Sequence, residues 1–510
     1  MVVAMSRVRY CAFALILACP CVGLSTQFDQ ADGTGEMSQP VQDTTYRFFP
    51  QVSSSVKQRV IRPSNPKQTP DILPGASNDL TIGQSLSPSV DTPTVMDAKF
   101  PGITYTFYDP PDPNISVSTT HVVQVVNSDI AFFTKAGVKQ FQQSLDNTGF
   151  FQGVAQTSFV FDPKCIYDQG AKRFIVLALE QRVSPQNSGI LIAISDDADP
   201  NGNWTKYRID SKATIGGSSC WFDYPGFGYN KDGLVITGNM FTFGANAYKG
   251  AKSYAVQKSG LLSGGTVHFS WFNHPSAFTI MPTRIFESVS TRVFGVSIKN
   301  SSTFTFYAWS SLGGTPTVAS KDIAVPAFSF FNNEAQSTGG STLDPVADRM
   351  MDAAYRSGYL VCTHTVRVSS SDNRAMVRWY EFTMGSWPSS GTPSRRQSGN
   401  ISLAAPNHLF MPAIARNGNG AISIVLTRSS NTRTADLYAL SHKSTDPLGK
   451  FGPLSNIRSS THNPLGASNR WGDYFSIVND PSDAKRFWGC GQVISTNGQW
   501  ATHFVTWMVP

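Results

Sequence analysis

Residues 165–179 have the sequence CIYDQGAKRFIVLAL, in which one strand, a turn at Gly170 and a second, more apolar strand follow one another. The same order appears at residues 224–238 as YPGFGYNKDGLVITG. Five further copies begin at His121, Arg284, Met351, Met411 and Asp473. Self-similarity of this kind is typical of architectures built from repeated units.

The spacing of the copies predicts the number and size of these units. The second strands begin near Ile130, Phe174, Leu234, Val293, Tyr359, Ala421 and Phe487. Intervals of 44 to 66 residues leave room for two more strands in each unit. Seven four-stranded units predict an all-β fold, a seven-bladed β-propeller. Two consecutive β-sandwiches are the alternative, but nothing near the midpoint resembles a linker.

A propeller must close its ring, because a single blade cannot bury both of its faces. The last unit ends after its third strand, in the segment QWATHFVTWMV (499–509). We therefore expect the missing outer strand to come from the N-terminal side, at Ile103–Tyr108. The propeller is assigned to residues 101–510.

Composition excludes several classes of protein. Only 15% of the 510 residues are charged, while Gly (41) and Pro (31) are abundant, which excludes a coiled coil or a helical bundle. The net charge of +7 is thin for a chain of this length. We therefore predict no nucleic-acid partner.

Residues 1–23 have the pattern of a secretory signal peptide. Arg7 and Arg9 precede an apolar run that ends near Val22, and small residues follow. The run is shorter than a membrane anchor needs, and no later segment could span a bilayer. We expect secretion to the extracellular space or the cell surface. The run ILAC (16–19) loosely resembles a bacterial lipoprotein box, although Leu17 fits poorly.

Residues 24–100 are rich in Pro, Ser and Thr and predict an extended N-terminal arm. One interpretation is a flexible or glycosylated spacer. The other is an arm that docks on a blade edge of another copy, because apolar residues such as Phe48, Phe49 and Ile72 punctuate it. In that case other copies of the chain are its partners, and the contact builds a filament or surface layer.

Four cysteines follow the leader, an even number that is typical of disulfides in a secreted protein. Cys165 and Cys220 open the inner strands of adjacent units, so we predict a disulfide between them. Cys362 and Cys490 fall on units that are not neighbours and are expected to be buried free thiols. Four sequons predict glycosylation, at Asn114, Asn203, Asn300 and Asn400.

Several segments resemble those of a widespread set of secreted, largely uncharacterised β-propeller proteins. They include FDPKCIYDQGAKRFIVLAL (161–179), ADRMMDAAYR (347–356) and RWGDYFSIVNDPSDAKRFW (470–488). The resemblance covers residues 115–510 and implies fold and secretion, but no activity and no catalytic residue. The loops at Asp199–Trp204 and Asp446–Phe451 are also similar to the Asp-box turns of sialidases, with altered spacing, and we interpret them as structural.

Three segments with similar sequences, around Asp223, Asp352 and Asp473, stand where we expect innermost strands to begin. Arg349 and Arg470 stand three residues before the last two. These five residues are candidates for a site at the mouth of the channel, where carboxylates could hold a structural calcium ion or act as an acid/base pair. Alternatively, each Asp accepts hydrogen bonds from a neighbouring blade, with the two arginines as partners.

No complete catalytic constellation accompanies this pattern. The sequence has no GxSxG elbow, HExxH motif, P-loop or EF-hand loop. We therefore expect a secreted, glycosylated, non-catalytic binding or structural module whose partners are extracellular glycans or other copies of itself. The alternative is a carbohydrate-active enzyme or lectin with its site at the channel mouth; exposed tryptophans such as Trp271 and Trp500 would then stack on sugars, but more of them are expected to pack between blades.

Overall fold

Strands that are buried on both faces dominate the chain. β12 (Arg173–Arg182) is buried over most of its length, and β17 (Gly233–Thr242) is buried throughout. Burial of this kind is found where a sheet lies between two others. The computed structural model describes residues 27–29, 31–37, 41–43, 60–61, 94–287, 290–464 and 469–510. The predicted leader lies outside these residues.

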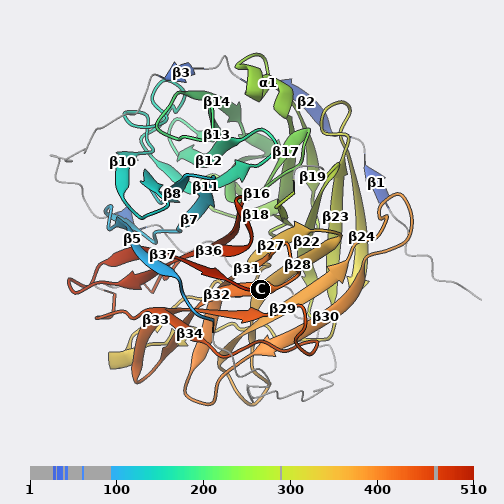
Figure 1. Ribbon diagram of the computed structural model, residues 1–510. Coiled ribbons are helices and arrows are strands. Elements are labelled where there is room, and N and C mark those ends of the chain that lie inside the picture. Colours follow the sequence, from blue (N-terminus) through green and yellow to red (C-terminus); the bar gives the residue numbers. More distant parts are fainter. Residues whose placement is uncertain are drawn as a thin grey trace, which may run out of the picture.

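Seven sheets are arranged in a ring, so the predicted seven-bladed β-propeller is confirmed (Figure 1). Blade 1 comprises β7 (Asn114–Val117), β8 (His121–Val126), β9 (Asp129–Thr134) and β10 (Lys139–Ser144). Blade 2 comprises β11 (Val160–Asp168), β12, β13 (Asn187–Ser195) and β14 (Trp204–Asp210). Blade 3 comprises β15 (Ala213–Ile215), β16 (Ser218–Tyr229), β17, β18 (Tyr248–Gln257) and β19 (His268–His274), with helix α1 (Lys258–Ser263) between the last two.

The other four blades continue the same order from the axis outwards. Blade 4 comprises β20 (Met281–Pro282), β22 (Arg292–Asn300), β23 (Thr303–Ser310) and β24 (Thr317–Ala324). Blade 5 comprises β21 (Arg284–Ile285), β27 (Asp352–Arg356), β28 (Tyr359–Arg367), β29 (Ala375–Thr383) and β30 (Ser394–Ile401). Blade 6 comprises β31 (His408–Arg416), β32 (Ile422–Ser430), β33 (Arg433–His442) and β34 (Ser455–Arg458).

Blade 7 closes the ring with a strand from the other end of the propeller. It comprises β35 (Ser476–Asp480), β36 (Asp483–Ile494), β37 (Trp500–Met508) and β5 (Ala98–Thr104). β5 pairs antiparallel with β37, as Phe100 opposite Phe504 shows. The closing strand thus begins five residues before the predicted Ile103. Each innermost strand also contacts the innermost strand of the next blade all the way round.

The described parts of the arm add strands to the outer edges of three blades of the same chain. β1 (Gln27–Asp29) pairs with β24, β2 (Gly33–Glu36) with β19, and β3 (Val41–Asp43) with β14. β4 (Val60–Ile61) pairs with β6 (Tyr108–Asp109). These pairings lie within one chain, so the predicted assembly of copies stays a prediction.

The connection between blades 4 and 5 contains the remaining elements. A short hairpin is formed by β25 (Ala335–Gln336) and β26 (Thr342–Leu343), with a 3-10 turn at Thr338–Gly340 between them. Asp344 forms an isolated parallel bridge with Arg470, so this connection lies against the segment before blade 7. None of the helices in the described part of the chain has the length and apolarity that a bilayer crossing requires.

The cysteine and glycan predictions need correction. Cys165 and Cys220 are both free and buried. Cys165 packs in a core cluster shared with blade 1, whereas Cys220 packs in a cluster with blade 3, and no bond joins them. The expected free thiols of Cys362 and Cys490 are confirmed.

The predicted sequons differ in accessibility. Asn114 is 3% exposed and accepts a hydrogen bond from the Cys165 N–H, so it cannot carry a glycan in the folded chain. Asn203 and Asn300 are exposed, and Asn400 is half-buried. Glycosylation of these three stays a prediction.

Candidate functional site

Several blades share a backbone feature within the innermost strand or just before it. Asp112, Asp162, Tyr224 and Met411 have φ values of 47°, 48°, 53° and 54°, and a proline follows each of them. Positive φ is uncommon for residues other than glycine, so the surrounding packing must hold these conformations. The ladder between β11 and β12 also skips from Phe161 to Lys164, which takes Asp162 out of register.

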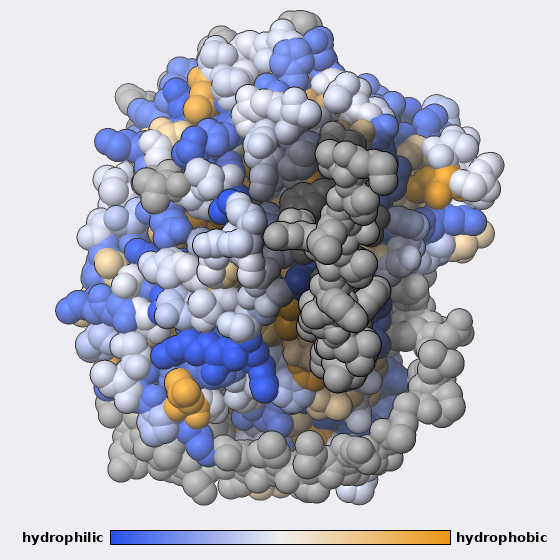
Figure 2. Space-filling view, turned by 90° about the vertical axis from the view of Figure 1, so that its right-hand side faces the viewer, coloured by the Kyte–Doolittle hydropathy of each residue, from blue (hydrophilic) through white to orange (hydrophobic). Residues whose placement is uncertain are grey.

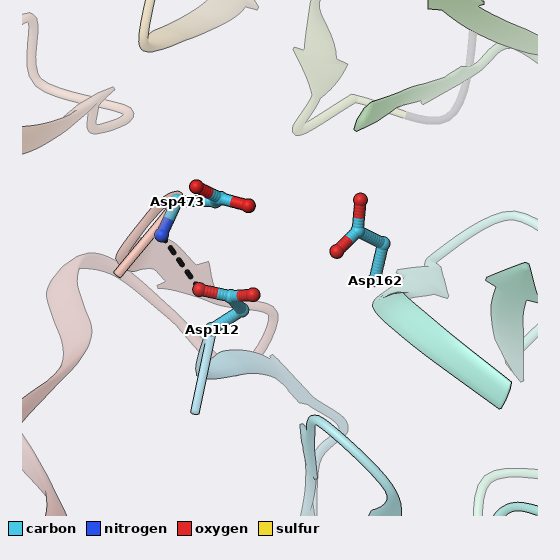
Figure 3. Close-up of side chains that lie close together, drawn as sticks. All are labelled: Asp112, Asp162 and Asp473. Atoms are coloured by element: carbon cyan, nitrogen blue, oxygen red, sulfur yellow. Dashed lines mark hydrogen bonds between the residues drawn. The ribbon is translucent and has the colours of Figure 1, made fainter. Parts of the chain in front are cut away.

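Three of the carboxylates at these strand starts converge in the channel. An oxygen from each of Asp112, Asp162 and Asp473 lies within 4.8 Å of the others, and all three side chains are buried (Figure 3). They come from blades 1, 2 and 7, and blade 7 is a neighbour of blade 1 only because the ring closes. The Asp473 N–H donates to Asp112 Oδ1 at 2.6 Å, as Figure 3 shows.

Neighbouring groups engage each of these carboxylates. Asn127 Nδ2 donates to Asp112 Oδ2 at 2.5 Å, and the Tyr224 N–H donates to Asp162 Oδ2 at 3.2 Å. Arg470 Nη2 donates to Asp473 Oδ1 at 2.5 Å. The cluster is therefore part of a hydrogen-bonded wall between blades.

Buried cations accompany the acids. Lys164 Nζ lies 2.9 Å from the centroid of the Tyr474 ring. Burial lowers the pKa of Lys164 to about 7, although Asp352 and other nearby carboxylates oppose the shift. Three carboxylate oxygens are ligands that suit calcium, which takes six to eight in proteins. Because Arg470 already supplies positive charge here, the predicted calcium ion stays a prediction.

Asp352, a predicted site residue, lies in a different arrangement. Arg284 holds it with two bonds, Nη1 to Oδ1 at 2.5 Å and Nη2 to Oδ2 at 2.6 Å. The Ile414 N–H of blade 6 also donates to Asp352 Oδ2 at 2.7 Å. Both oxygens are thus engaged, which agrees with the alternative in which the acid bonds to a neighbouring blade.

The remaining predicted residues are also buried. Arg349 is 2% exposed, donates from Nε to Asp348 Oδ1 at 2.8 Å and stacks over the Tyr224 ring at 4.4 Å. Asp223 is fully buried opposite Asn239 in the ladder. Among the described residues, the converging acid group contains Asp473 but neither Asp223 nor Asp352.

Sequence reasoning missed Asp112 and Asp162. Both form Asp-Pro dipeptides, and Asp162 lies in an innermost strand just as Asp223 does. This shared dipeptide was the available signal.

Two cavities bear on where a ligand could bind. A cavity of about 20 Å³ between the innermost strands is lined by residues such as Ser116, Cys165 and Asn479, and it has room for about one water molecule. A wider hollow of about 800 Å³ lies on the outside, against blades 5 and 6. Its lining is polar: Asn332, Asn333, Glu334, Gln336, Thr342, Ser371, Asp372, Asn373, Arg374 and His408, with Ala405 and Pro406.

The predicted sugar-stacking tryptophans are mostly internal. Trp309, Trp379 and Trp387 are fully buried, Trp500 is 3% exposed, and Trp271 is partly buried. On the face drawn in Figure 2, apolar residues of the coloured part form small separate groups among hydrophilic ones. This agrees with the few exposed large apolar side chains, which are Val95, Phe107, Val138, Val183, Leu448 and Met508.

Comparisons with known proteins leave the family open. No family model and no curated protein matches the chain, so the resemblance to a family of secreted propellers rests on its motifs. Solved structures are similar at low identity. An α-L-arabinofuranosidase of Fusarium graminearum is 8% identical, with 81% of this chain and 96% of that chain covered and a TM-score of 0.37.

Two further solved structures are similar to the same degree. The β-propeller domain of the Trilobed protease from Pyrococcus furiosus is 10% identical, with coverages of 81% and 94% and a TM-score of 0.35. The Hadza microbial sialidase Hz136 is 9% identical, with coverages of 77% and 74% and a TM-score of 0.33. At these scores the likenesses carry no argument about function.

Proposed function

We propose that the protein is a non-catalytic binding or structural module that works outside the cell. The observation that supports this most is the Arg284–Asp352 pair, in which both carboxylate oxygens are occupied. Hydrolysis of a glycoside by paired carboxylates needs an acid and a base that face a bound sugar. The cavity of about 20 Å³ that Arg284 lines has no room for one, whereas small-molecule sites have several hundred Å³.

The ligand of such a module would bind on the outer surface. The polar hollow of about 800 Å³ is large enough for a saccharide. Its carboxylates are engaged: Glu334 accepts from Thr342 Oγ1, and Asp372 from Arg374 Nε at 2.8 Å. The amides of Asn332, Asn333 and Asn373 are the groups that would donate to a sugar.

The test combines turnover with stability. We expect no turnover when the purified protein is screened on chromogenic glycosides. We expect Asp352→Ala to lower the free energy of unfolding by about 3 to 5 kcal/mol, because it leaves Arg284 buried without its counter-ion. The double variant Arg284→Met with Asp352→Leu should recover most of that loss. Turnover that Asp352→Asn abolishes, with the circular dichroism spectrum unchanged, would overturn the proposal.

A further inference from the structure

The positive charge of the protein is concentrated in two neighbouring blades. Residues 352–458, which span blades 5 and 6, contain 12 Lys and Arg against 5 Asp and Glu. The rest of the chain has 29 of each kind. These two blades therefore carry the whole surplus of +7.

Part of this charge lies on the outside of the ring, along the outer strands of blades 5, 6 and 7. We call the following six residues the basic rim: Lys99, Arg395, Arg396, Lys443, Lys450 and Arg458. Lys443 and Lys450 are half-buried and the other four are exposed. They belong to β5, β30, β34 and the loop before β34.

Contacts between the blades make the rim continuous. The Gly449 N–H, next to Lys450, donates to Gln397 Oε1 on β30 at 2.9 Å. Lys99 Nζ donates to the Asn456 carbonyl on β34 at 2.9 Å. The elements that carry the rim are thus in contact from blade 5 over blade 6 to blade 7.

Acidic residues near the rim include Glu381 and Asp446. Glu381 is buried and binds Arg396 and Arg416. Asp446 is half-buried and accepts from the Lys443 N–H at 2.7 Å. Within the described residues, Arg395 and Arg458 take part in no ion pair.

His503 reports the same positive environment. It lies on β37, opposite Pro101 of β5. Burial lowers its pKa to about 4, and the positive charges of Arg458 and Lys99 contribute to the shift.

Edge protection accounts for only part of the rim. Charged residues on an open outer strand prevent pairing with other chains, and Arg395 and Arg458 stand on such strands. Lys443 and Lys450, however, lie in a loop that has no open edge to protect. A row of cations spanning three blades instead fits a ligand that carries many negative charges along its length.

We propose that the basic rim binds a linear anionic polysaccharide that carries sulfate or carboxylate groups. The proposal rests on the proposed function as a binding module and names its partner class. Recognition of single-stranded nucleic acid uses exposed aromatic rings on which bases stack. In the described part of the chain, the one exposed large aromatic is Phe107, which is not on the rim. Cations without stacking rings favour the polysaccharide.

The experiment measures binding of the full chain to immobilised heparin, with polygalacturonate as the carboxylate probe and dextran as the uncharged one. The rim variant is Arg395→Ser, Lys443→Ser and Arg458→Ser, which leaves Arg396 on the buried Glu381. The matched control removes three exposed lysines of other blades, with Lys212→Ser, Lys231→Ser and Lys299→Ser. We expect salt-dependent binding to heparin or polygalacturonate that the rim variant weakens about tenfold and the control changes less than twofold.

Three results would overturn the inference. They are no binding to either anionic probe at low salt, equal losses in the two triple variants, or binding to double-stranded DNA alone. None of them touches the proposed absence of catalysis, which the glycoside screen tests separately.

Discussion

At the scale of single residues, His274 gives a prediction about pH. It lies on β19, where its Nε2 forms a hydrogen bond with Ser253 Oγ at 2.9 Å. Burial lowers the pKa of His274 to about 4, whereas an unfolded chain protonates histidine near pH 6.5. Between these values only the unfolded state takes up the proton. Stability is therefore full above about pH 6.5 and falls as the pH drops towards 4.

The prediction is measured by urea unfolding at a series of pH values from 7 to 4. We expect the free energy of unfolding of His274→Gln to fall less between pH 7 and pH 4 than that of the wild type, by about 3 kcal/mol. His462→Gln removes an exposed histidine and should keep the slope of the wild type. Identical slopes for His274→Gln and the wild type would contradict the prediction.

The candidate site shows how far single residues could be predicted. Asp473 and Arg470 were predicted and do lie together, because they are three residues apart on one segment. Asp112 was missed because its contact with Asp473 spans 361 residues of sequence. Ring closure creates such contacts, and the spacing of residues along one chain does not encode them.

At the scale of elements, the strand β2 fits its blade through two glycines. A side chain at Gly33 would begin inside the Trp271 ring, and one at Gly35 would lie 2.8 Å from the Phe269 ring. The Asp32 N–H donates to the Trp271 carbonyl at 2.9 Å, and Met37 is buried against the same blade. Residues 31–37 are therefore shaped to this edge.

The fit predicts that Gly33→Val with Gly35→Val releases β2 from β19. Hydrogen exchange should quicken at the amides of residues 31–37 and at those of Phe269 and Trp271 that face them. The control is Gly314→Val, where an added side chain meets nothing within 4 Å. Unchanged exchange at residues 31–37 in the double variant would contradict this fit.

Elements with strong hairpin patterns were predicted well, and short ones were not. The hairpin at His121 is β8 with β9, one strand further out than in the unit at Cys165. The innermost strand of blade 1 is β7, whose four residues, NISV, are too few to show a period. For the arm, the sequence left a spacer and docking on another copy open, and it did not indicate docking on the same chain, because an edge of the same chain and an edge of a neighbour offer identical hydrogen bonds.

At the scale of the whole molecule, the net charge of the chain does not show that the positive charge is concentrated in two blades. A net charge of +7 over the chain was interpreted as too small for a nucleic-acid partner. The fold divides the sequence into blades, and the same charge then belongs to two of them. The number of blades can be predicted from the spacing of the repeats alone. The distribution of charge around the ring can be predicted only when the boundaries of the blades are known.

The arm also has a consequence for the whole molecule. β1, β2 and β3 cover the outer edges of blades 4, 3 and 2. Open edges pair with other chains unless charge or cover prevents it. A chain that begins at residue 44 exposes all three, and with them Phe269 and Trp271.

We therefore expect light scattering to give the mass of one chain for the protein that begins at residue 24. The chain that begins at residue 44 should give a mass that rises with concentration. The chain with Gly33→Val and Gly35→Val keeps its full length but loses one cover, so its mass should lie between the two. If the chain from residue 24 already assembles, the arm pairs between copies, as the filament hypothesis requires. If the chain from residue 44 stays monomeric, β14, β19 and β24 resist pairing without cover. In that case β1, β2 and β3 are not needed to protect these edges.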